Sequence, residues 1–136
     1  MVLRAGSALR GSQRQAWTLR SGEGNGRATP YTVAFDFGKM PAGKATLRLA
    51  ISGGSAPYID VLVNQQPAGR VSLTGDSTIA RNGIAGIWYE RELPFEASLM
   101  KTGTNVMQLI VPAGPVTSGV LYDYVRLELD ESAPAR

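Results

Sequence analysis

Two glutamates, Glu90 and Glu92, come nearest to the spacing of a catalytic carboxylate pair. On one strand they lie about 6.6 Å apart, within the roughly 5–9.5 Å that separates the paired carboxylates of glycosidases. Those carboxylates flank a bond from opposite sides of a cleft. Here both glutamates project from one face of one strand and alternate with Arg91, as on an ordinary solvated face. The pair therefore does not predict a glycosidase.

The 136 residues contain neither histidine nor cysteine. Histidine is the commonest general base and transition-metal ligand, and a cysteine thiolate is the other common nucleophile and zinc ligand. Serine–histidine hydrolysis, thiolate zinc sites and disulfides are thereby excluded. We predict that the chain is not an enzyme and has no catalytic residues.

Alternation over residues 87–95 places a tryptophan on the solvent side of a strand. One face holds Ile87, Tyr89, Leu93 and Phe95, and the other holds Trp88, Glu90 and Glu92. An outward indole is a flat apolar ring near water, which suits the C–H face of a sugar. Coverage of Trp88 by a loop, the N-terminal segment or a second domain is an equal alternative.

The glycine-punctuated stretch 76–86 (DSTIARNGIAG) offers three polar side chains, Asp76, Arg81 and Asn82, of which Arg81 and Asn82 are predicted ligand contacts. A guanidinium binds a carboxylate through paired hydrogen bonds, so Arg81 suits an acidic sugar such as galacturonate. The alternative role for Arg81 is a surface ion pair, which stabilises little.

The closing segment 120–129 (VLYDYVRLEL) also alternates. One predicted face holds Leu121, Asp123, Val125, Leu127 and Leu129, and the other holds Tyr122, Tyr124, Arg126 and Glu128. An inward Asp123 is costly unless it is hydrogen-bonded, paired or metal-bound. Structural calcium would account for it, but a backbone or arginine partner accounts for it better.

Short period-two runs separated by Gly, Pro and Asn predict an all-β, antiparallel β-sandwich or barrel. The candidate strands are 15–20, 31–37, 45–51, 58–63, 69–73, 87–93, 105–111 and 119–129. One helical turn is expected at 95–101, ended by Gly103. We assign the folded domain to residues 28–131, with a tail at 132–136 and a largely irregular N-terminal segment at 1–27 apart from the strand at 15–20.

The basic charge belongs to that N-terminal segment. Residues 1–27 hold five arginines and one glutamate, whereas the remaining residues hold nine cations and ten anions. The folded body is therefore nearly neutral, which argues against nucleic-acid binding. No apolar run approaches the ~20 residues of a membrane helix, and the N-terminus lacks the apolar stretch of an intact secretory signal.

Five segments, in order, resemble the C-terminal (third) jelly-roll domain of rhamnogalacturonan lyases. They are AGKATLRLAISGG (42–54), VLVNQQPAGRV (61–71), DSTIARNGIAGIWYE (76–90), LMKTGTNVMQLIV (99–111) and GVLYDYVRLEL (119–129). The pair of patterns DSxIxRxGIxG and LYDYxRLEL is the most specific part. The hairpin departs from the family, since it reads VNQQ where the family tends to have Asn-Gly.

The resemblance implies a jelly-roll (galactose-binding-like) fold. It also implies a non-catalytic module that binds pectin outside the cell, with rhamnogalacturonan as the first candidate ligand. Lyase chemistry in that family resides in a separate domain. By resemblance Arg81 is a substrate contact and Trp88 occupies an aromatic position. Asn82, Tyr122 and Tyr124 complete the predicted carbohydrate contacts. The alternative function is a structural domain that packs against a lyase catalytic domain and has no ligand of its own.

Overall fold

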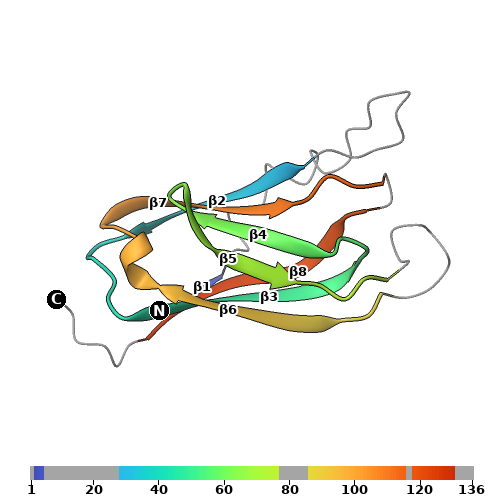
Figure 1. Cartoon of the computed structure of the whole chain (residues 1–136). Helices are drawn as coiled ribbons and strands as arrows, with labels where there is room; N and C mark the ends of the chain where they lie inside the picture. Colours follow the sequence, from blue (N-terminus) through green and yellow to red (C-terminus); the bar gives the residue numbers. More distant parts are fainter. Residues whose placement is uncertain (1, 5–27, 77–85, 116–117, 131–136) are drawn as a thin grey trace.

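The structure, a computed structural model, describes residues 2–4, 28–76, 86–115 and 118–130 and is built almost entirely of strands (Figure 1). The strands of this part are β1 (Val2–Arg4), β2 (Thr29–Phe37), β3 (Lys44–Gly54), β4 (Tyr58–Val63), β5 (Gln66–Ser72), β6 (Tyr89–Glu96), β7 (Gly103–Val111) and β8 (Val120–Leu129). The 3-10 turn η3 (Ala97–Leu99) joins β6 to β7. In the described residues no helix is long and apolar enough to cross a membrane.

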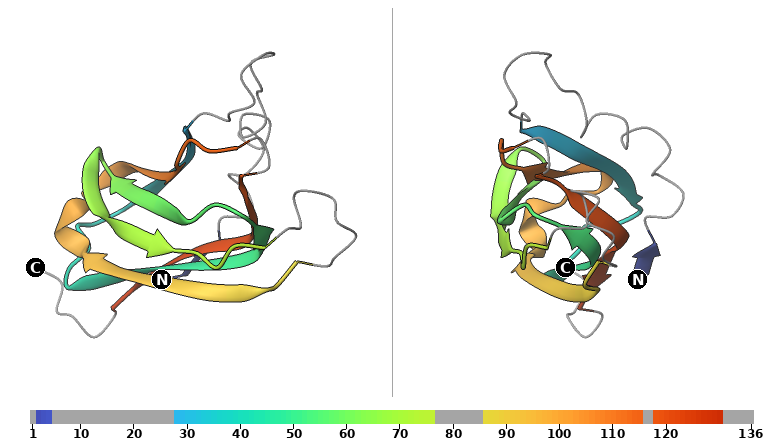
Figure 2. Two further views of the ribbon diagram at one scale, coloured as in Figure 1. Left: turned by 45° about the vertical axis from the view of Figure 1, so that its right-hand side comes forward. Right: turned by 90° about the vertical axis from the view of Figure 1, so that its right-hand side faces the viewer.

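The strands form two antiparallel four-stranded sheets stacked face to face (Figure 2). One sheet has the order β1-β8-β3-β6 and the other has the order β2-β7-β4-β5. Successive strands cross repeatedly from one sheet to the other, which is the jelly-roll arrangement. The predicted all-β antiparallel sandwich is therefore confirmed.

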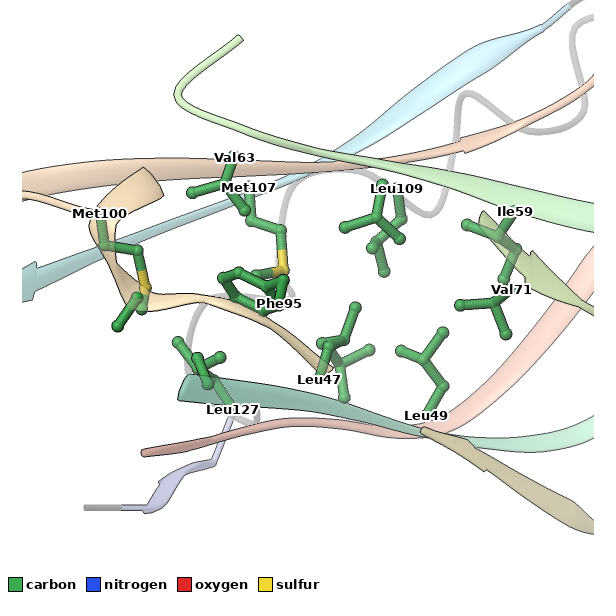
Figure 3. Packing of buried hydrophobic residues seen from close by; sticks show 14 of the residues in the cluster. Leu47, Leu49, Ile59, Val63, Val71, Phe95, Met100, Met107, Leu109 and Leu127 are labelled. Carbon is green, nitrogen blue, oxygen red and sulfur yellow. The ribbon is translucent and has the colours of Figure 1, made fainter. Parts of the chain in front are cut away.

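Alternating apolar side chains from both sheets fill the space between them (Figure 3). Leu47 and Leu49 of β3 lie opposite Leu109 of β7 and Ile59 of β4, and all four are fully buried. Burial of each such side chain is worth roughly 1.5–3 kcal/mol relative to exposure. The period-two pattern of the sequence thus corresponds to one buried and one outer face per strand.

The predicted elements agree with the observed ones in type and differ at their ends. The strand at 58–63 has the predicted bounds, and the helical turn expected at 95–101 is the shorter η3. Strand β1, which the sequence did not predict, pairs with β8 at residues 126–128. The strand predicted at 15–20 lies outside the described residues.

The prediction for the first half of β8 is wrong, because a β-bulge reverses its faces. Ala50 of β3 pairs with Tyr124, and the next residue of β3, Ile51, pairs with Tyr122. Asp123 is the extra residue between them, and one extra residue turns all side chains beyond it to the opposite face. Consequently Asp123 is exposed rather than inward, and Tyr122 packs against the core rather than outside.

Two asparagines organise the end of the sandwich that holds η3 and the β4–β5 turn. Asn105 is fully buried, accepts from the Lys101 amide and donates to the carbonyls of Lys101 and Gly103. Asn64 donates to the side-chain oxygen of Asn105 at 2.9 Å. Asn64 and Gln65 both have positive φ, at 49° and 69°, so the VNQQ hairpin turns in two residues as Asn-Gly would.

Candidate functional site

The other end of the sandwich, called here the Gly54 end, comprises residues 52–57, 73–76, 86–88, 112–115 and 118–120. It lies at the right-hand side of Figure 1, where β3 and β5 end and β6 and β8 begin. Of the predicted contact residues, Trp88 lies here, and Tyr122 and Tyr124 follow on β8. Arg81 and Asn82 belong to the loop between Asp76 and Gly86. That loop is outside the described residues, so neither side chain is placed.

Asp76 joins three segments of the Gly54 end. Its Oδ1 accepts from the Gly54 amide and its Oδ2 accepts from the Ile87 amide, each at 3.1 Å. The Asp76 amide in turn donates to the Gly54 carbonyl. Residues 76 and 87 flank the loop that carries Arg81, so the hydrogen bond from Ile87 to Asp76 holds the two ends of that loop together.

Gly54 itself allows a close approach between two loops. Its φ is +142°, and a Cβ added there would lie 2.4 Å from the Gly119 carbonyl oxygen. That oxygen accepts from the amides of Ser55 and Ala56. Because only glycine fits this conformation and this gap, the loop after β3 is fixed against the chain entering β8.

Trp88 directly precedes β6 and is 54% exposed. Its Nε1 donates to Oδ2 of Asp123 at 3.0 Å. Asp123 is the bulged residue of β8. Strand β3 lies between β8 and β6, so the bulge lets the Asp123 carboxylate reach across β3 to Trp88. The hydrogen bond fixes the orientation of the ring while leaving it open to solvent.

Two further apolar side chains at this end are exposed, against the prediction that both face inward. Ile87 is 57% exposed and Leu121 is 37% exposed. Ile87 precedes the first residue of β6, so the alternation of the strand does not extend to it. Leu121 lies beyond the Asp123 bulge and therefore faces outward.

Tyr122 lies beneath the Gly54 end. Its ring stacks on Tyr31 of β2, with centroids 5.5 Å apart and planes at 22°. Its hydroxyl is buried and has no hydrogen-bond partner among the described residues. Burial raises the pKa of Tyr122, because the phenolate would have to form away from water. The predicted outward position of Tyr122 is therefore wrong. The residue instead packs against the core beneath the Gly54 end.

Tyr124 lies on the outer face, as predicted, and hydrogen-bonds through its hydroxyl to Oε1 of Glu90. The two side chains come from β8 and β6 and pair on either side of Ala50, which is completely buried although its Cβ points outward. A small residue on β3 thus lets the tyrosine reach the glutamate across it.

The charged residues of the outer face are paired with one another. Arg48 Nη1 lies 2.5 Å from Glu92 and 3.9 Å from Glu90, and its Nε lies 3.5 Å from Glu128. Glu128 also lies 2.9 Å from Arg126. Glu90 and Glu92 are therefore held in an ion-pair network on a single sheet face, which agrees with their rejection as a catalytic pair.

A latch between the two sheets stands beside Trp88. The Tyr89 hydroxyl donates to the Thr74 carbonyl and accepts from the Thr74 amide. Arg91 places its guanidinium 4.5 Å from the centroid of the Tyr89 ring and donates to the Ser72 carbonyl and the Thr74 hydroxyl. Burial raises the pKa of Tyr89. The latch ties the end of β5 to β6 and so positions Trp88.

Metal binding has no support from the placed acidic residues. Within the described part of the chain no three acidic side chains gather as metal ligands would. Asp123, the residue considered for calcium, instead accepts from Trp88. The sequence did not indicate the role of Asp76, although its position at the start of a glycine-punctuated loop was a usable signal.

The comparisons with known proteins identify the domain. Residues 9–127 match the family model described as "CBM-like: Polysaccharide lyase family 4, domain III". The chain belongs to this family. The resemblance to the third domain of rhamnogalacturonan lyases is thereby confirmed, and domains of this carbohydrate-binding-module-like (CBM-like) family are non-catalytic, as predicted. No curated protein matches the chain in sequence.

Solved structures similar to the CBM-like domain support its fold. The CBM35 from Cellvibrio japonicus Abf62 has a TM-score of 0.58 at 16% identity, over 94% of this chain and 91% of that one. The CBM35 from Paenibacillus barcinonensis has a TM-score of 0.52 at 15% identity, over 96% and 99%. At such identities the likeness concerns the fold alone, and together with the family it supports a carbohydrate-binding role.

Proposed function

We propose that this CBM-like domain binds plant cell-wall polysaccharide outside the cell, as a non-catalytic accessory to a polysaccharide lyase. Pectin is the first candidate ligand, and within pectin the first candidate is rhamnogalacturonan. The observation that carries the proposal is the exposed indole of Trp88, oriented by Asp123. A sugar ring stacks on such a platform through its apolar C–H face, and the ordered indole loses little freedom on binding.

Polar contacts complete the proposed site. Arg81 and Asn82 belong to the loop between Asp76 and Gly86. Because Asp76 binds the Ile87 amide, both ends of this loop lie close to Trp88. Arg81 is assigned to a galacturonate carboxylate because a guanidinium binds it through paired hydrogen bonds. Tyr124 is assigned to the next sugar along the outer face. Each contact is weak alone, so attachment to an enzyme would raise the effective affinity.

The test is a binding screen of the domain against rhamnogalacturonan, polygalacturonate, xylan, mannan and cellulose. We expect retention by a pectic ligand and a loss of about 5- to 150-fold in affinity on Trp88→Ala, if a sugar stacked on the indole contributes the roughly 1–3 kcal/mol that a nucleobase stacked on an aromatic ring contributes. Ile87→Ala is the matched control, because it removes a neighbouring exposed apolar side chain without removing the platform. A folded protein that retains none of these ligands would contradict the proposal.

The second candidate function is a structural domain that packs against a lyase catalytic domain. It is favoured by the exposure of Ile87, Trp88 and Leu121 at the same end of one sheet. Under it these side chains form an interface, and the isolated domain should self-associate through them. Sedimentation equilibrium over a hundredfold concentration range, with Ile87→Ser and Leu121→Ser, distinguishes the two: a ligand-binding monomer rejects the interface, whereas association that both variants abolish supports it.

A further inference from the structure

The described side chain in contact with the Trp88 indole is acidic. Asp123 accepts a hydrogen bond from the indole nitrogen, and no described cation pairs with its carboxylate. Glu90, on the same outer face, lies 3.9 Å from Arg48 and is paired with it. Arg91 binds the Ser72 carbonyl and Thr74 beside the Tyr89 ring. Asp123 therefore places beside the platform a negative charge that no described cation pairs with.

The same groups are hydrogen-bond acceptors and cannot donate when ionised. Asp123 uses Oδ2 for the indole, and Glu90 uses Oε1 for the Tyr124 hydroxyl. The second oxygen of Asp123 remains beside the ring, on an exposed residue. A sugar hydroxyl can donate to it. A uronate carboxylate has no proton to donate at neutral pH and would bring a like charge close to Asp123.

We infer that Asp123 is a specificity-determining residue, which orients Trp88 through one oxygen and accepts a hydroxyl of an uncharged sugar through the other. The inference rests on the proposed function and deepens it. In a chain of alternating neutral and acidic sugars, the neutral one stacks on Trp88 and the acidic one lies away from the ring. A chain made only of uronate offers no neutral sugar for this position.

Two pectic probes separate these cases: rhamnogalacturonan backbone, with a neutral rhamnose at every second position, and polygalacturonate, with none. Titrations followed by tryptophan fluorescence or calorimetry give both affinities. We expect the wild-type domain to bind rhamnogalacturonan at least about tenfold more tightly than polygalacturonate, since like-charge juxtaposition is strongly unfavourable.

The decisive variant is Asp123→Asn. Its amide oxygen can still accept from the Trp88 indole, so the ring stays in place while the charge is removed. We expect polygalacturonate affinity to rise several-fold and the preference for rhamnogalacturonan to shrink. Glu96→Gln is the control, because it makes the same change in net charge on an exposed residue at the opposite end of β6.

The outcomes also separate this inference from the proposed function. If polygalacturonate binds as tightly as rhamnogalacturonan, or if Asp123→Asn fails to strengthen its binding, the inference is overturned while pectin binding stands. If the folded domain binds neither probe, the proposed function fails and the inference fails with it.

Discussion

Gly54 and Asp76 bind each other reciprocally: the Gly54 amide donates to Oδ1 of Asp76, and the Asp76 amide donates to the Gly54 carbonyl. The remaining carboxylate oxygen of Asp76 reaches the Ile87 amide just before Trp88. These hydrogen bonds join the loop after β3 and the segment after β5 to the residue that precedes Trp88.

The first prediction concerns the carboxylate of Asp76. Asp76→Ala leaves the amides of Gly54 and Ile87 without their acceptor, and we expect the free energy of unfolding to fall by about 1–3 kcal/mol. Asp76→Asn keeps one acceptor oxygen and should lose less. Urea denaturation measures the stability of both variants and of the wild type. Equal stability of all three proteins would show that the hydrogen bonds of the Asp76 carboxylate contribute nothing to the free energy of unfolding.

A second prediction follows from the conformation of Gly54. In Gly54→Ala the new methyl group would meet the Gly119 carbonyl oxygen at 2.4 Å in a backbone conformation that side chains rarely adopt. We expect a loss of at least about 2 kcal/mol in the free energy of unfolding. Gly38→Ala is the matched control, since a Cβ there meets no atom within 4 Å. Comparable melting temperatures for the two variants would contradict the packing described for the Gly54 end.

Third, the β4–β5 turn carries a residue in an unfavourable conformation. Gln65 has φ 69°, where a residue other than glycine costs roughly 1–2 kcal/mol. Gln65→Gly removes that cost and adds some unfolded-state entropy, so we expect a net gain of roughly 0.5–1 kcal/mol. Gln66→Gly, one residue on and within β5, should destabilise instead. Thermal unfolding of the pair tests the sign, and a loss for both variants would refute the two-residue turn.

The fourth prediction uses the buried hydroxyl of Tyr122. Tyr122→Phe removes a polar group that has no partner among the described residues, so stability at pH 7 should be unchanged or should rise by up to about 1 kcal/mol. The stacking on Tyr31 is retained. A clear loss of stability would mean that the hydroxyl does have a stabilising partner.

Tyr122 also makes stability depend on alkaline pH. Burial raises its pKa in the folded state above the value of about 10 in the unfolded chain. Between these two values the folded state keeps the proton that the unfolded state has released, so stability falls as pH rises above about 10. Tyr122→Phe should flatten this fall between pH 9 and 11, leaving a smaller slope from Tyr89, whose pKa burial also raises. An unchanged slope would contradict the assignment.

Sequence patterns predicted the sandwich well because burial on alternate positions is a local signal. The strand at 58–63 follows from period two alone. The pattern failed where the period was interrupted. The extra residue Asp123 reversed Tyr122 and Leu121, and no property of those side chains reveals a bulge, because it is set by pairing with β3.

Contacts between distant segments were also beyond the sequence patterns. Nothing in a linear pattern indicates that Asp123 will meet Trp88, 35 positions earlier, or that Asp76 will hold Gly54. Likewise Asn105 was predicted only as the first residue of a strand at 105–111, whereas it is a fully buried hydrogen-bonding residue. These pairings depend on strand order, which the period-two pattern does not determine.

The most direct test of the central claim is to follow the Trp88 indole itself by ¹H–¹⁵N NMR while rhamnogalacturonan is added, with the indole resonance assigned by Trp88→Phe. The account predicts that the Trp88 Nε1–H resonance shifts in a saturable manner and that Ile87→Ala does not abolish this shift. A folded domain in which rhamnogalacturonan leaves that resonance unmoved would contradict the claim that Trp88 is a carbohydrate platform.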